Sequence, residues 1–158
     1  MTTQGATSME PEVQVFEDFV GDWDLELTIQ PTPGASPSVL KGKAQRRLSG
    51  GRWLISDLQA DSGFEGHGVY GFDATRGRYV GVWADSMTPV FAHSDGVWDK
   101  ATKTFAFDTH ATVGAQVHKY REVIETRGDG TQLYRHLMPT PEGGEFEMIR
   151  IIYRRRAA

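Results

Sequence analysis

One stretch of the chain, residues 66–87, constrains the fold more than any other because it has the composition of a strongly bent β-hairpin. Glycine interrupts strand-forming residues on both sides of a polar turn, and glycine within a strand marks a bend or a large side chain crossing from the neighbouring strand. A loop from Ala74 to Gly77, with a positive φ at Gly77, would leave Asp73 opposite Arg78. The hairpin therefore predicts a curved antiparallel sheet.

This turn sets a register for the whole hairpin. Trp83 then lies across from Gly68, and Tyr70 lies across from Gly81, so each bulky side chain faces a residue that has none. An equivalent turn predicts the same large-to-small matching in a second hairpin, over residues 96–107. The further pairs expected are Phe72 with Tyr79, Gly96 with Phe107, and Trp98 with Phe105.

The rest of the chain continues this pattern. Apolar residues at helical spacing predict one short helix over residues 11–20, and from Asp22 onward apolar and polar residues alternate with the period of a strand. About ten strands in sequence order, joined by short turns, favour an all-β, single antiparallel up-and-down barrel. We expect a flexible segment over residues 1–9 and the barrel domain over residues 10–156. The expected strands cover residues 22–29, 38–48, 52–60, 64–73, 78–86, 90–98, 104–110, 116–127, 131–138 and 145–154.

Composition narrows the class of protein. A chain of 158 residues is long enough for one domain and too short for two ordinary ones. The absence of cysteine removes disulfides and thiol chemistry, and it suits a reducing compartment. No window approaches the roughly 18 apolar residues of a membrane span, and the first ten residues lack the apolar run of a secretory signal. We therefore expect a cytoplasmic protein that does not bind membranes.

Charge is unevenly distributed along the chain. The formal net charge is −4, residues 1–40 contain no lysine or arginine, and residues 154–156 are all arginine. Three arginines on an acidic chain, without interleaved aromatic residues, do not indicate a nucleic-acid partner. In a closed barrel the last strand pairs with the first, which would set these arginines beside acidic residues. The acidic residues concerned are Asp22, Asp24 and Glu26.

Several motifs resemble a known family. Gly21, Asp22 and Trp23, directly after the helix, resemble the glycine, any residue, tryptophan signature of lipocalin-like barrels. Together with the runs at 50–54, 66–87 and 149–153, they are similar to the bacterial family catalogued as domain of unknown function 1579, over residues 16–155. The resemblance implies a lipocalin-like antiparallel barrel with an internal ligand site, and no established reaction or substrate.

The resemblance also bears on cofactors and on the first strand. In related haem-binding barrels small residues follow the tryptophan, whereas Asp24, Leu25 and Glu26 follow it here, so we expect no cofactor. In lipocalin-like barrels an arginine of the last strand often covers the first-strand tryptophan. The resemblance implies that Arg150 or Arg154 covers Trp23.

One candidate site comes from the hairpin over residues 116–138. Its turn predicts Glu122 opposite His136, with Tyr134 opposite Ile124 on the same face. A carboxylate beside an imidazole orients it and raises its pKa, as a general acid or base requires. The alternative is an exposed pair on the outer barrel wall, with little energetic weight. The same face would hold Tyr120 opposite Met138.

A second candidate site is Trp83 with Asp85, on the face that also carries Tyr70. A carboxylate near the end of this strand could meet a ligand hydroxyl or amine. Alternatively, Asp85 is a structural carboxylate that binds backbone amides at the barrel rim. His67 lies on the opposite face, and we expect the aromatic face to line the interior.

The other imidazoles are spread over different strands. Their spacing is not that of a metal site, so we predict none. The residues concerned are His67, His93, His110 and His118.

Three functions remain open. The leading one is binding of a small, mainly apolar molecule inside the barrel. The second is an enzyme that isomerises, cyclises or hydrates such a molecule, with His136, Glu122 or Asp85 transferring protons. The third is an interaction module with a filled interior, and a homo-oligomer also stays open because edge pairing is invisible in the sequence. The expected ligand-binding residues are Tyr70, Trp83, Asp85, Tyr120, Tyr134, His136 and Met138.

Overall fold

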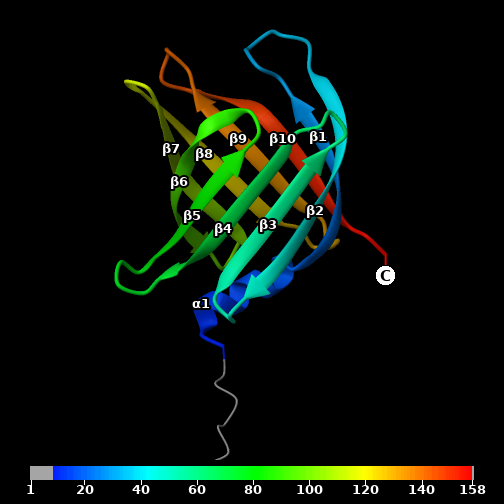
Figure 1. Ribbon diagram of the computed structural model, residues 1–158, viewed down its shortest axis with the longest axis vertical. Coiled ribbons are helices and arrows are strands. Elements are labelled where there is room, and N and C mark those ends of the chain that lie inside the picture. Colours follow the sequence, from blue (N-terminus) through cyan, green and yellow to red (C-terminus); the bar gives the residue numbers. More distant parts are fainter. Residues whose placement is uncertain (1–8, 158) are drawn as a thin grey trace, which may run out of the picture.

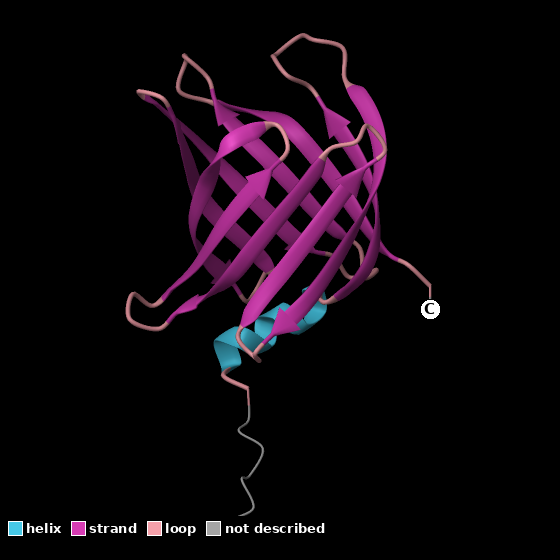
Figure 2. Cartoon of the chain, viewed as in Figure 1, coloured by secondary structure: helices cyan, strands magenta, loops and turns pink. Residues whose placement is uncertain are grey.

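The computed structural model describes residues 9–157, which form ten strands and one short helical segment (Figures 1 and 2). The helical segment consists of the single α-turn α1 (Pro11–Gln14) and the 3-10 helix η1 (Val15–Phe19). The helix predicted over 11–20 is thus confirmed in place. The segment predicted to be flexible, residues 1–9, lies outside the described residues except for Met9. The strands are β1 (Gly21–Ile29), β2 (Ser38–Ser49), β3 (Trp53–Ala60), β4 (Glu65–Asp73), β5 (Arg78–Asp85), β6 (Thr88–Asp99), β7 (Thr104–Val113), β8 (Gln116–Thr126), β9 (Gln132–Pro139) and β10 (Glu145–Arg155).

The sheet closes because β1 pairs with both β2 and β10, while every other strand pairs with its sequence neighbours. The predicted all-β, up-and-down antiparallel barrel is therefore confirmed. At the closure Arg154 lies across from Asp24, and the Nε of Arg156 lies 3.3 Å from the Oδ1 of Asp24. The expected placement of the C-terminal arginines beside acidic residues of the first strand is confirmed. No helix within residues 9–157 has the length and apolar character to cross a membrane.

The predicted register of the β4–β5 hairpin is also confirmed. Trp83 is the partner of Gly68, and Tyr70 is the partner of Gly81. A Cβ added to Gly81 would lie 2.4 Å from the ring of Tyr70, and one added to Gly66 would lie 2.0 Å from the ring of Trp83. Glycine is therefore required where these rings cross the neighbouring strand. The other predicted pairs are also present: Phe72 with Tyr79, Gly96 with Phe107, and Trp98 with Phe105.

Two turns near the helices share one design. In the β4–β5 turn, Gly77 has a φ of +64° and the Asp73 carboxylate accepts backbone N–H groups of the loop. In the β6–β7 turn, Asp99 does the same, but Lys103 has the positive φ, at +51°. A lysine therefore adopts a backbone conformation that favours glycine.

The helical segment lies across one end of the barrel, which we call the closed end (Figure 1). Aromatic side chains fill this end. Phe16 and Phe19 of η1 pack on Phe105 of β7, with ring centroids 5.9 and 5.4 Å apart. Tyr79 joins them, and its hydroxyl donates to the carbonyl oxygen of Glu12 at 2.8 Å. Burial raises the pKa of Tyr79 to about 12. The helical segment thus acts as a plug held by aromatic packing.

The first-strand tryptophan is covered by an arginine, but not by either residue that the resemblance implied. The guanidinium of Arg155 lies 4.3 Å from the ring centroid of Trp23 and donates to the carbonyl oxygens of Asp18 and Val20. Arg155 is the partner of Trp23 across β1 and β10, whereas Arg154 pairs with Asp24. The expected Arg150 or Arg154 is therefore wrong, because Arg150 and Arg154 alternate with the inward-facing residues of β10.

Candidate functional site

Inward-facing side chains differ between the two ends of the barrel. At the closed end Phe105 and Phe107 are buried. Toward the other end, which we call the open half, Tyr70, Trp83 and Tyr134 also face inward, yet each keeps accessible surface. These three rings are half-buried and pack against the buried clusters of the barrel core.

The polar centre of the open half is Glu122, on β8. Its carboxylate accepts hydrogen bonds from the hydroxyls of Tyr134 at 2.5 Å, Thr109 at 2.6 Å and Ser94 at 3.4 Å. These donors come from β9, β7 and β6, so four neighbouring strands build one polar wall. Burial and the adjacent Glu122 charge raise the pKa of Tyr134 well above its usual range.

The predicted pairing of Glu122 with His136 is confirmed as a register, and both residues lie on inward-facing rows. The alternative of an exposed pair on the outer wall is therefore wrong. The expected interaction is also wrong: within residues 9–157 no hydrogen bond or ion pair joins the two side chains. The carboxylate of Glu122 accepts hydrogen bonds from hydroxyl groups instead.

His136 has a different environment from the one expected. Its Nε2 lies 3.2 Å from the sulfur of Met138, and its ring stacks on Tyr120 with centroids 4.0 Å apart and planes 11° apart. Burial lowers the pKa of His136 to about 4, where the sequence predicted a raised value. An imidazole between an aromatic ring and a thioether loses its hydration and gains no anion, so its neutral form is favoured.

Trp83 and Asp85 face the lumen together, as predicted. The Trp83 indole N–H donates to Asp85 at 2.8 Å, and the other carboxylate oxygen accepts backbone N–H groups of Met87 at 2.9 Å and Thr88 at 3.1 Å. The alternative role of Asp85, a rim carboxylate bound to backbone amides, is therefore confirmed. His67 lies on the exposed outer wall and contacts Asp57 at 2.6 Å, also as predicted.

A buried cation lies at the closed end. Arg46 is only 6% exposed and donates to the side-chain oxygen of Gln132 at 2.6 Å. Its guanidinium also lies 4.1 Å from the ring centroid of Tyr153 and 5.7 Å from that of Phe19. The lumen therefore has a positive charge near the plug and carboxylates in the open half.

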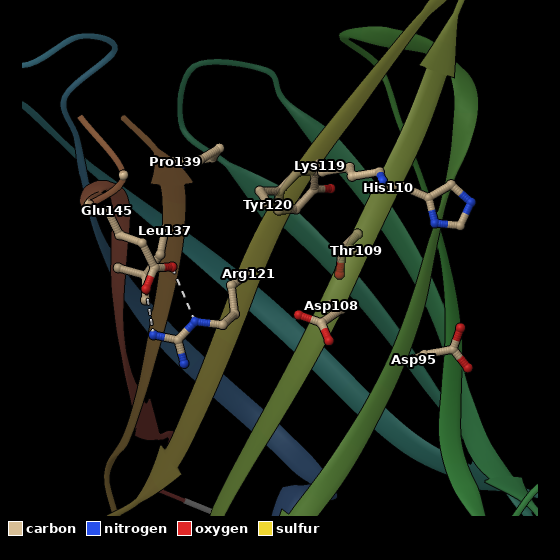
Figure 3. Close-up of a pocket in the computed structure, with 12 residues that line it drawn as sticks. Asp95, Asp108, Thr109, His110, Lys119, Tyr120, Arg121, Leu137, Pro139 and Glu145 are labelled. Carbon is tan, nitrogen blue, oxygen red and sulfur yellow. Dashed lines mark hydrogen bonds and ion pairs between the residues drawn. The ribbon is translucent and has the colours of Figure 1, made fainter. Parts of the chain in front are cut away.

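The wall between β8 and β9 is interrupted near the open half. Their pairing ends at Arg121 and Leu137, so the expected partnership of Tyr120 with Met138 is not made. A hollow of about 670 Å³ lies here on the outer side (Figure 3). Arg121 and Glu145 face each other at this hollow, joined by two hydrogen bonds of 2.9 and 3.1 Å, and Tyr120 also lines it. Tyr120 thus stands between the hollow and the lumen.

Comparison with known proteins agrees with this architecture. A family model described as a protein of unknown function (DUF1579) matches residues 8–155. The chain belongs to this family. The DUF1579 chain also resembles the crystal structure of Rv2717c from M. tuberculosis, with a TM-score of 0.72, 13% identity, and coverage of 95% of this chain and 100% of that one. At this identity the likeness concerns the fold alone. A search of curated proteins finds no match.

The histidines of this DUF1579 barrel are spread over several strands. In the part of the chain that the structure describes, no group of three or more His, Cys, Asp or Glu residues is placed to hold a metal ion. His93 and His110 stack on each other across β6 and β7, with ring centroids 5.5 Å apart. They lie on strand positions that alternate with Ser94 and Thr109 of the lumen wall.

Sequence reasoning missed several polar residues of the DUF1579 lumen. Ser94 and Thr109 are ordinary strand residues until the register places them beside Glu122. Arg46 stands two residues after Ala44, and Ala44 is the partner of the inward-facing Trp23. Strand alternation would have predicted an inward Arg46 once this pairing was known.

Proposed function

We propose that this DUF1579 barrel binds a small, mainly apolar molecule in the open half of its lumen. The observation that supports this is the accessible surface that Tyr70, Trp83 and Tyr134 keep although they face inward. Ligand sites are typically concave and lined by apolar and aromatic groups, with a few polar groups that orient the ligand. Tyr70, Trp83, Tyr120, Tyr134 and Met138 would supply the apolar contacts, and Asp85 and His136 polar ones.

The direct test is binding of the fluorescent probe N-phenyl-1-naphthylamine, which is apolar and emits strongly outside water. We expect saturable fluorescence enhancement with the wild-type protein. Trp83→Ala should weaken binding about tenfold, equivalent to about 1.4 kcal/mol, because an indole face is lost from the wall. The matched control is Trp53→Ala, since Trp53 lies on the outer wall and is 40% exposed.

A second variant tests the location of the probe by filling the lumen. Ala111 is buried on β7, on the row that holds Phe107 and Thr109. Ala111→Phe should reduce probe binding strongly while circular dichroism still reports a folded barrel. Absence of saturable binding to wild type, or equal effects of Trp53→Ala and Trp83→Ala, would overturn the proposal.

An enzyme acting on such a molecule is the second candidate, and the inward-facing position of His136 opposite Glu122 supports it. A neutral imidazole can accept a proton, whereas Asp85 and Glu122 already accept several hydrogen bonds each. A molecule that co-purifies with the protein can be identified by native mass spectrometry and incubated with fresh protein. Conversion that is lost in His136→Gln and retained in His67→Gln would support this candidate, and an unchanged molecule would exclude it.

We also place the activity in the cytoplasm, because a chain without cysteine suits a reducing compartment. Nucleic acids and membranes are not among the partners that we propose. Sedimentation of the purified protein would test whether it forms a homo-oligomer.

A further inference from the structure

We propose that the open half of the lumen selects organic cations, that is, apolar molecules that carry an ammonium group. This inference rests on the proposed function and specifies the class of ligand. It follows from the charges, hydrogen bonds and aromatic rings that face this part of the lumen.

Two carboxylates face the open half without a basic partner. Every ion pair found within residues 9–157 involves other acidic residues, so neither Glu122 nor Asp85 takes part in one there. Their hydrogen-bond donors are the hydroxyls of Ser94, Thr109 and Tyr134, one indole and two backbone amides. All of these donors are neutral. They satisfy the oxygens but place no positive charge in direct contact with either carboxylate.

The positive charges of the barrel interior lie toward the closed end, where the charge of Arg46 acts on Tyr70 and Tyr153, as that of Glu122 also does. Arg46 is buried at the closed end, against Phe19 of the plug, and Arg155 covers Trp23 beside the same helical segment. His136 is neutral because it is desolvated. A cation that enters the open half would therefore meet two acids and no repelling charge from this imidazole.

Aromatic rings surround Glu122. Tyr134 donates to it, and its charge contributes to raising the pKa of Tyr70 and of Tyr120, so both phenols lie within reach of its field. Asp85 contributes to the same effect on Tyr120. Aromatic faces attract ammonium groups through their quadrupole, most strongly where water is excluded. A carboxylate among aromatic rings therefore offers charge and ring faces together to an organic cation.

The test compares three ligands of equal chain length: decylammonium, 1-decanol and decanoate. Each is titrated against the wild-type protein loaded with N-phenyl-1-naphthylamine, and its affinity is read from displacement of the probe. We expect decylammonium to bind at least about tenfold more tightly than decanoate, with the alcohol between them. This comparison needs no variant, so a folding defect cannot obscure it.

Two variants then test whether Glu122 causes the selectivity for cations. Glu122→Gln keeps the shape of the side chain and should bring the three affinities to within about twofold of one another while the probe still binds. Glu145→Gln is the matched control, since Glu145 pairs with Arg121 on the outer wall, and it should keep the wild-type order.

The outcomes separate this inference from the proposed function. If the probe itself does not bind to wild type, the proposed function fails. If the probe binds and responds to Trp83→Ala, but decanoate binds as tightly as decylammonium, only the selectivity for cations is overturned. An unchanged preference in Glu122→Gln would also overturn the assignment of that selectivity to Glu122.

Discussion

The closed end and the open half of the barrel are built from the same strands but differ in the side chains that face inward. At the closed end, Phe16, Tyr79 and Phe105 pack ring against ring and exclude water. In the open half, Glu122 and Tyr134 form a hydrogen-bonded wall beside half-buried rings. The comparison shows that dense aromatic packing lies at one end, whereas the hydrogen-bonded polar wall lies further along the barrel axis. Dense packing at one end allows the other to carry inward-facing polar groups, because stability is not uniform across a structure.

The largest effect is expected from the aromatic packing at the closed end. Phe105→Ala removes a ring that contacts both the plug and β5, and it should lower the free energy of unfolding by about 3–5 kcal/mol. Phe146→Ala changes the same side chain on β10, where the ring is half-buried near the open rim, and should cost about 1–2 kcal/mol. Urea denaturation measures both. Equal losses would show that the two ends contribute equally to stability.

The next effect is acid sensitivity in the open half. The unfolded chain binds a proton at His136 below pH 6.5, whereas the folded protein does so only below about pH 4. Stability should therefore fall as the pH drops from 6.5 to 4, by about 1.4 kcal/mol per unit and about 3 kcal/mol in all. His136→Gln should remove this part of the pH dependence in urea denaturation.

The control for this measurement is His67→Gln, because His67 is exposed on the outer wall. It should leave the loss of stability between pH 6.5 and 4 intact. The same slope in wild type and His136→Gln would mean that His136 is not desolvated in the folded protein.

A smaller effect is expected from the glycines that make room for rings. A Cβ at Gly66 would overlap the ring of Trp83, so Gly66→Ala should displace that ring and cost about 1–3 kcal/mol. Probe binding should change with it, because the same ring faces the lumen. In Gly128→Ala the new methyl group meets nothing within 4 Å, and stability should change by less than about 0.5 kcal/mol. Similar thermal midpoints for the two variants would contradict this assignment.

The smallest effect concerns the two related turns near the closed end. Lys103→Gly should stabilise the protein by about 0.5–1 kcal/mol, because glycine adopts the positive φ of +51° without strain. Gly77→Ala, at the equivalent place in the other turn, should destabilise it by about 1 kcal/mol. Neither change should alter probe binding in the open half. Changes in stability of the same sign for both variants would show that the two turns differ in design.

Most of the fold could be predicted, because large rings that must face glycines on the neighbouring strand allow few strand registers. Trp83 over Gly68 and Tyr70 over Gly81 follow from one turn, and the same logic predicted Trp98 across from Phe105. The covering arginine could not be predicted correctly, since its position depends on the β1–β10 register. No local turn sets that register.

The candidate site could be predicted only as a set of residues sharing a face. The alternation of β8 and β9 placed Glu122 and His136 side by side, as the structure does. The partners of Glu122 depended on Thr109 and Ser94, which lie one and two strands before it, on β7 and β6. The carboxylate of Glu122 accepts hydrogen bonds from their hydroxyls. The imidazole of His136 instead contacts the ring of Tyr120 and the sulfur of Met138.

By itself the sequence determined the barrel, its hairpin registers and the face on which Trp83 and Asp85 stand, because these depend on period two and on turns between neighbouring strands. Only the tertiary structure decided that Arg46 lies buried at the closed end, that Glu122 forms no ion pair within residues 9–157 and that His136 is neutral. The physical reason is that charge and pKa depend on every group within a few ångströms. In a closed barrel those groups come from strands that the sequence separates and the sheet brings together.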